Sequence, residues 1–220
     1  MPSDTIQAHF DALSDRDAVT RGRAIDALAE AQPAELVTRL KPLLEDVDWV
    51  VRFKAACALA WAGDDAGGPV LIEALPQREL CFMALQALSA LGSDKARPGL
   101  EAFFRRRFLH PLERLQAAAA LVRCGDPDAA AFIEEKMNTG QPEERGFALE
   151  LWGRLGLPGA LDKLQGVLVD PQHPHRLDAV RGLAELGDGR AKNLLGRIAQ
   201  DPDDLELAAE ARAALDDLDV

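Results

Sequence analysis

The chain of 220 residues has no tyrosine, only three cysteines and four histidines, and aromatic residues make up 5% of it. Its cysteines lie far apart without a CxxC pair, which argues against a disulfide framework and favours a reducing compartment. No apolar run approaches the roughly 18 residues that a membrane span needs. The first residues lack the basic and apolar segments of a signal peptide. We therefore expect a cytoplasmic protein with no membrane partner.

Motifs of common enzymes are also missing. The sequence contains no HExxH, GxSxG, GxxxxGK[ST] or His-Glu dipeptide. One His-x-His pair, His173 and His175, has no further ligand near it in the sequence, and we interpret it as a polar turn between helices rather than a metal site. The three thiols are interpreted as small buried hydrophobic residues. We expect no catalytic residue, no metal, no cofactor and no small-molecule substrate.

Positive charge is scarce. Lys and Arg number 25 against 37 Asp and Glu, which gives a net charge of −12 and disfavours a general nucleic-acid binder. The balance is uneven, because residues 95–123 hold seven basic side chains and two acidic ones. This segment is a candidate surface for an anionic patch on a partner protein; the alternative is solvation of a helix end, where cations complement the helix dipole. The candidate residues are Arg105, Arg106, Arg107, Arg114 and Arg123.

What the sequence does have is a pattern that recurs seven times. An arginine, replaced by Cys81 in the third copy and Ala208 in the seventh, is followed by a small residue three positions later, a small residue at six in all copies but the fifth, a large apolar residue at seven and a turn residue at eleven. Apolar residues at this spacing share one face of an α-helix, and glycine at its end is typical of a left-handed terminal residue. The turn column falls at residues 32, 63, 92, 125, 156, 187 and 219, so successive copies are 29 to 33 residues apart.

A second helical stretch precedes the pattern in each copy, and no segment alternates with a period of two. A single hairpin of this size cannot bury its apolar face, so it must stack on its neighbours. We predict an all-α fold, a right-handed α-solenoid of about seven helical hairpins in a single domain, 1–220. The predicted hairpins are 3–32, 33–63, 64–92, 93–125, 126–156, 157–187 and 188–220.

The signature Val51-Arg52, Ala55-Ala56, Ala58-Leu59 and Gly63-Asp64 resembles HEAT repeats. The short repeat unit is similar to the HEAT-like type of phycobilisome lyases. The resemblance implies that the second helix of each hairpin lines a concave groove. It also implies a ladder in which an Asp ahead of the Arg pairs between neighbouring repeats.

The acidic side of that ladder is incomplete in this sequence. The position four before the Arg is Asp at residues 17, 48 and 204 and Gln or His in the other copies, although Asp also occurs at residues 15, 46 and 170. The third copy has Cys81 in place of the Arg. We expect the ladder to be interrupted at copies three to five.

One column departs from the pattern of a generic solenoid. The position directly after the Arg points away from the hairpin core at 100° per residue. Large apolar residues occupy it in three successive copies, and others flank it on one of these helices. Such a column is either an exposed binding surface or is buried by crowding between second helices. The candidate partner-binding residues are Trp49, Phe53, Cys57, Trp61, Phe82 and Leu115.

These observations favour a non-enzymatic scaffold or adaptor that binds another protein in its groove. Two alternatives remain open. The repeat type implies an accessory subunit of a bilin lyase-isomerase, and a nucleic-acid-binding HEAT-like protein is the other, although the acidic balance disfavours it.

Overall fold

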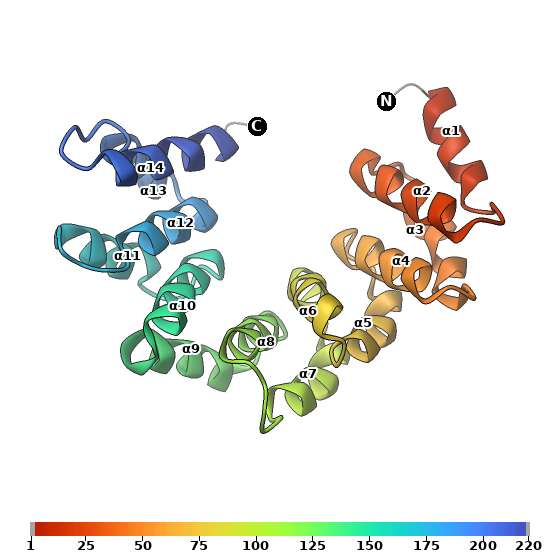
Figure 1. The fold of residues 1–220 in the computed structure, drawn as a ribbon, viewed down its shortest axis with the longest axis horizontal. Coiled ribbons are helices and arrows are strands. Elements are labelled where there is room, and N and C mark those ends of the chain that lie inside the picture. Colours follow the sequence, from red (N-terminus) through yellow and green to blue (C-terminus); the bar gives the residue numbers. More distant parts are fainter. Residues whose placement is uncertain (1–2, 219–220) are drawn as a thin grey trace. The chain divides into compact units, whose positions relative to one another are not determined.

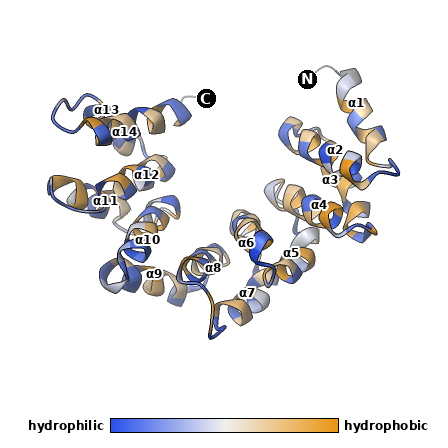
Figure 2. Cartoon of the chain, in the orientation of Figure 1, coloured by the Kyte–Doolittle hydropathy of each residue, from blue (hydrophilic) through white to orange (hydrophobic). Residues whose placement is uncertain are grey.

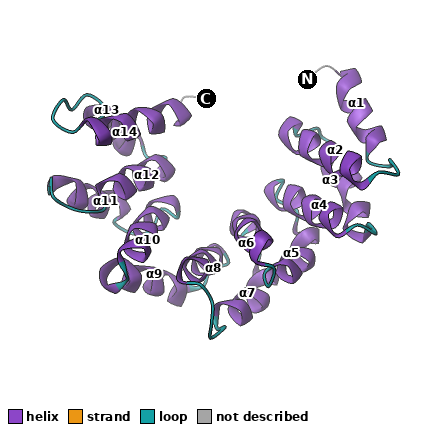
Figure 3. Ribbon diagram, viewed as in Figure 1, coloured by secondary structure: helices purple, strands orange, loops and turns teal. Residues whose placement is uncertain are grey.

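The computed structural model describes residues 3–218, and every regular element in that range is helical (Figure 1). Figure 3 shows helices joined by short loops, as a chain of hairpins requires. The predicted all-α solenoid of HEAT-like hairpins is confirmed. Within the described residues, no helix is both long and apolar enough for a membrane span.

The first helices of the hairpins are α1 (Ser3–Ala12), α3 (Leu36–Leu40), α5 (Gly68–Ala74), α7 (Arg97–Phe104), α9 (Pro127–Thr139), α11 (Ala160–Val169) and α13 (Gly189–Ile198). The second helices are α2 (Ala18–Ala31), α4 (Trp49–Trp61), α6 (Arg78–Leu91), α8 (Pro111–Arg123), α10 (Pro142–Arg154), α12 (Arg176–Leu186) and α14 (Leu205–Leu218). Short 3-10 helices extend three of the first helices: η1 (Lys41–Glu45), η2 (Asp65–Gly67) and η3 (Asp94–Ala96).

The helices form two compact units. The first unit is Met1–Leu109 with Arg123–Gly125, and the second is His110–Val122 with Asp126–Val220. In the first unit, α4 packs against α2 and α6 within a layer of second helices, and α3 and α5 pack on its other side (Figure 1). In the second unit, α12 packs against α10 and α14 in the same way, with α11 and α13 behind it. The expectation of one domain over the whole chain stays a prediction.

Each unit has its own hydrophobic core. Leu28, Leu40 and Leu59 are fully buried in the first, and Leu164, Leu183 and Leu195 in the second. Figure 2 shows that individual helices carry both hydrophobic and hydrophilic residues, as amphipathic helices in a two-layer stack should.

The second helices end as the sequence predicts. The backbone is left-handed at all six turn-column positions within the described residues, whereas Asp219 lies outside them. Five of the six are glycines, which adopt this conformation without steric cost. The sixth is Gln32, with φ of 46°. At the N-terminal ends of two second helices, Asp17 and Asp48 cap α2 and α4 by accepting backbone N–H groups.

The Arg–Asp ladder is present only in part. Arg21 donates two hydrogen bonds to Asp46, of 2.8 and 2.6 Å, and Arg176 pairs with Asp204. Burial opposes ionisation of Asp46, but the Arg21 guanidinium and a backbone N–H outweigh it and hold the pKa of Asp46 below its usual value. The pair therefore stabilises the fold at pH values above the usual pKa of Asp. This stabilisation is lost as the pH falls through the lowered pKa of Asp46.

In copy five, Arg145 donates instead to the carbonyl oxygen of Met137, at 3.3 Å. Arg145 thus contacts a backbone group, although Asp170, six positions before the next Arg, is the equivalent of Asp46.

Glycine allows α10 and α12 to touch backbone to backbone. A Cβ added at Gly153 would collide with the carbonyl of Gly182, and one added at Gly146 would collide with the carboxylate of Asp178. Both glycines of α10 are buried, and they lie seven residues apart on the face towards α12.

We predict that Gly153→Ala destabilises the protein by about 2 kcal/mol or more, because an extra methyl in a tight core forces the backbone apart. Urea unfolding followed by circular dichroism measures this. The matched control is Gly196→Ala in α13, where an added Cβ meets nothing within 4 Å. That variant should gain about 0.5–1 kcal/mol from helix propensity. Equal stabilities of the two variants would contradict the close contact.

Candidate functional site

The structure divides the predicted apolar column into buried and exposed members. Phe53, Cys57 and Leu115 are 3%, 2% and 0% exposed, so of the two alternatives for the column, burial holds for these three, and they are not part of an exposed binding surface. Phe82 and Trp61 are 44% and 51% exposed, as a binding surface requires.

The reason for the burial is lateral packing of second helices. Two contacts show this packing. In each, the position directly after the Arg is covered by a side chain of the next copy, which stands two residues after the Arg of that copy. Lys54 lies over Gly22 in this way, at 3.4 Å from an added Cβ, and Asp178 lies over Gly146. The column faces away from its own hairpin core, but the neighbouring hairpin covers it.

Trp49 is half-buried at the start of α4. The guanidinium of Arg52 lies 5.1 Å from the centre of its ring, and the indole Nε1 is buried without a hydrogen-bond partner. Trp49 therefore packs against Arg52 of its own helix and is only partly exposed.

Exposed apolar side chains nevertheless gather on the second helices of the first unit. Val50 and Trp61 of α4 share one helical face, and Phe82 and Met83 occupy neighbouring positions on α6. Their exposures are 54%, 51%, 44% and 46%. We call these four residues the α4–α6 apolar face. Val50 and Met83 were missed by the sequence analysis, because only the column after the Arg and the large residues flanking it on α4 were considered there.

We predict opposite stabilities for two charge substitutions in the original column. Phe53→Glu strands a carboxylate in a packed site and should cost about 4 kcal/mol or more. Phe82→Glu, at a half-exposed site, should cost about 1 kcal/mol or less. Chemical unfolding of both variants beside the wild type decides the matter, and a stable Phe53→Glu protein would show that the column is open.

The candidate basic residues are engaged locally. Arg105–Arg107 lie in the loop that follows the C-terminal end of α7 at Phe104. Arg105 pairs with Glu101 at 3.0 Å, and the guanidinium groups of Arg106 and Arg107 lie over the rings of Phe103 and Phe108. Arg123 is exposed in the first unit, and Arg114 is half-buried in the second. An anionic partner for these residues stays a prediction.

The three thiols are buried. Burial raises the pKa of the Cys57 thiol to about 12, and the Cys124 thiol donates to the carbonyl oxygen of Ser93 at 3.2 Å. Because the thiolate is the reactive form, a raised pKa opposes nucleophilic chemistry at Cys57.

We predict that the native protein reacts slowly with Ellman's reagent at pH 8 and that three thiols per chain react once urea unfolds it. Native reactivity above that of a small-molecule thiol, lost in Cys57→Ala, would contradict a purely structural role for this cysteine.

The second helices of the second unit carry charge where the first unit carries apolar groups. Arg181 of α12 pairs with Glu210 at 2.6 Å and with Asp178 at 3.7 Å. Burial raises the pKa of Glu150 on α10, while Arg154 opposes the shift. Asp178, Arg181 and Glu210 make an ion-pair network between α12 and α14. It was not visible in the sequence because its members come from two different copies.

The His173–His175 turn is more ordered than a solvated loop. His175 is 7% exposed and its Nδ1 lies 3.0 Å from the Asp178 carboxylate, while its backbone N–H donates to Nδ1 of His173 at 3.2 Å. Among residues 3–218, no group of three or more His, Cys, Asp or Glu is placed to hold a metal ion. The absence of a metal stays a prediction.

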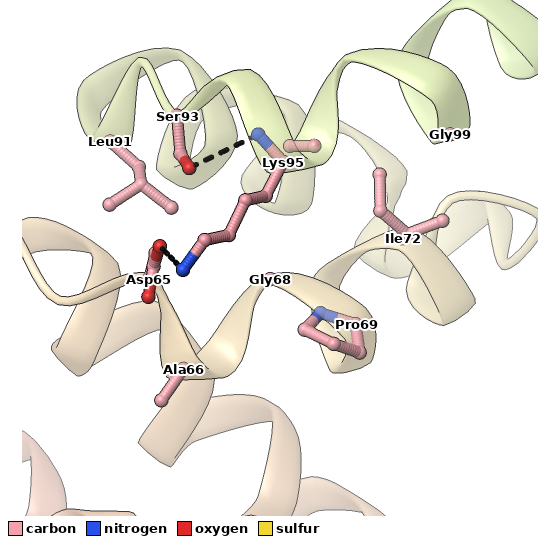
Figure 4. Close-up of a pocket in the computed structure, with 10 residues that line it drawn as sticks. Asp65, Ala66, Gly68, Pro69, Ile72, Leu91, Ser93, Lys95 and Gly99 are labelled. Atoms are coloured by element: carbon pink, nitrogen blue, oxygen red, sulfur yellow. Dashed lines mark hydrogen bonds and ion pairs between the residues drawn. The ribbon is translucent and has the colours of Figure 1, made fainter.

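A cavity of about 530 Å³ lies in the first unit between η2–α5 and η3–α7. Figure 4 shows that Lys95 reaches across it to Asp65, at 2.7 Å, while Ile72 and Pro69 line it with aliphatic groups. A second cavity, of about 440 Å³, lies beside Val19 and Gly22 and contains the Asp26–Lys54 ion pair. In both cavities a lysine is neutralised by a carboxylate, and their chemistry resembles that of ordinary surface clefts.

Comparison with known proteins agrees with the repeat geometry. The sequence model of HEAT repeats matches residues 6–81 and 133–216, more than half of the chain. The chain belongs to the HEAT-repeat family. No curated protein sequence matches it.

Solved structures also resemble this HEAT-repeat chain. The complex of CpcE and CpcF of phycocyanin lyase from Nostoc sp. PCC7120 matches with a TM-score of 0.62 at 20% identity, covering 99% of this chain and 96% of that one. Human deoxyhypusine hydroxylase matches with a TM-score of 0.40 at 17% identity, covering 98% and 96%. At 20% identity the first match supports the fold alone. The second match, with its lower TM-score, supports no conclusion about this chain.

Proposed function

We propose that this HEAT-repeat chain is a non-enzymatic scaffold that binds another protein through the α4–α6 apolar face. The observation that carries the proposal is the exposure of Val50, Trp61, Phe82 and Met83 on adjacent second helices. Aromatic residues and Met are enriched in protein interfaces, where their large side chains fill pockets of the partner.

The surroundings of this face suit a docking site. Beneath it, Phe53 and Cys57 are buried, so the surface rests on a packed layer. The Asp26–Lys54 ion pair beside Val50 supplies a polar rim. Apolar groups at the centre with polar groups around them are the usual anatomy of a protein interface.

The two units differ in a way that supports this choice. In the second unit, Arg181 occupies the second-helix layer with its carboxylate partners, and that layer is a network of paired charges. Paired surface charges contribute little binding energy, whereas a partly exposed aromatic group gains much from burial.

The test is a double variant, Phe82→Glu with Met83→Glu, used as bait in the lysate of the source organism. We expect the wild type to retain a specific partner and the variant to lose it, with a circular dichroism spectrum like that of the wild type. The matched control is Phe108→Glu, a 90% exposed aromatic residue in the loop after α7. The control should retain the same partner.

Two results would count against the proposal. Retention of the partner by the double variant would remove this face, and Arg105–Arg107 would become the next surface to change. Loss of the partner in Phe108→Glu as well would indicate that any added negative charge disrupts the contact.

A second candidate function is that of an accessory subunit of a bilin lyase-isomerase. It is supported by the repeat type and by the match to a chain of the CpcE–CpcF complex, which covers nearly the full length of this chain and of the matched chain. Mixing the purified chain with a bilin and an acceptor protein tests it. A shift in the bilin absorption spectrum followed by transfer to the acceptor would favour this candidate over a plain scaffold.

A further inference from the structure

A cavity in the second unit differs in charge from the two described in the first. It has a volume of about 270 Å³ and lies among the C-terminal end of α9, helices α10 and α11, and the loop before α12. Arg145, Lys163, His173 and His175 line it, and none of the side chains that line it is a carboxylate. Excess positive charge is notable in a chain whose net charge is −12.

The hydrogen bonds of the two histidines assign their tautomers. Nδ1 of His173 accepts the backbone N–H of His175, so the neutral ring carries its proton on Nε2. Nδ1 of His175 donates to Asp178, which leaves its own Nε2 without that proton when the ring is neutral. The rings stand edge to face with centres 5.7 Å apart. His173 therefore supplies one N–H donor beyond its contact with the turn.

Arg145 is a ladder arginine that has lost the usual ladder contact. In copy one the equivalent Arg21 is held by both oxygens of a carboxylate. Arg145 contacts the Met137 carbonyl through Nε, and the residue lines the cavity. Burial lowers the pKa of His173, the positive charges of His175 and Arg145 lower it further, and the negative charge of Asp170 opposes the shift.

Lys163 adds a second cation in a fixed position. Its Nζ lies 2.8 Å from Glu134 Oε1 and 5.0 Å from the centre of the Trp152 ring. Glu134 partly neutralises the lysine from outside the cavity, but the ring and the carboxylate together restrict where the ammonium group can lie.

We propose that this cavity binds a small oxyanion, either a phosphate or a carboxylate group. Arg145 supplies a planar pair of donors of the kind that matches two oxygens, Lys163 a point charge, and His173 a directed N–H. A divalent cation would be repelled by the same groups. The volume of about 270 Å³ is just below that of typical ligand pockets, about 300–1,000 Å³, and suits an ion rather than a large cofactor. This proposal concerns the second unit and does not depend on the α4–α6 apolar face.

The test is a titration of the whole chain with inorganic phosphate, and separately with succinate, at pH 7 and low salt. The imidazole nitrogen signals of His173 and His175 in NMR spectra report binding, and sodium chloride at matched ionic strength corrects for screening. We expect saturable shifts with at least one probe. A tighter response to phosphate or to succinate distinguishes the two sources of the oxyanion.

Variants locate the site. Arg145→Gln should weaken binding by about tenfold or more, because a charge-assisted hydrogen bond is lost. Arg190→Gln removes the same charge from an exposed residue of α13 that pairs with Asp188, and it should leave the affinity within about twofold. His173→Leu provides a second test should Arg145→Gln fail to fold, and it should also abolish the saturable response.

The proposal is overturned if neither probe gives a saturable shift. It is equally overturned if Arg190→Gln weakens binding as much as Arg145→Gln does, since the response would then be a general effect of charge.

Discussion

Close packing between successive second helices is the constraint on which the rest of this structure depends. The residue three positions after the Arg position is a buried alanine in every copy; Ala55, Ala84 and Ala148 are each 0% exposed. With so little side chain between them, neighbouring helices approach until backbone meets backbone, as at Gly153 and Gly182. A larger residue at these positions would separate the layers and expose the core of each hairpin.

The same constraint explains which parts of the sequence analysis succeeded. Features internal to one hairpin were predictable, because they follow from helical periodicity and turn chemistry. The left-handed column was located from the sequence at every described position, even at Gln32, which is not a glycine. The Arg21–Asp46 contact was predictable in kind, although the acidic residue that the Arg binds lies six positions before the next Arg rather than four.

Features that depend on the neighbouring hairpin were harder to predict. A helical wheel shows that Phe53 faces away from its own hairpin, but it contains no information about a second helix lying alongside. In the next copy, Met83 stands two residues after the Arg position, as Lys54 does over Gly22.

The ladder shows how a structural position can become available for binding. In copy one, the carboxylate of Asp46 satisfies Arg21 and also accepts the backbone N–H of Asp48, so the arginine is fully committed to joining two repeats. For Arg145 of copy five, the residue equivalent to Asp46 is Asp170 of the next copy. Asp170 accepts the N–H of Gln172, while Arg145 contacts a backbone carbonyl. The tight α10–α12 contact through glycine already holds these repeats together. These repeats therefore meet without an Arg–Asp pair at Arg145, and the arginine lines a cavity instead.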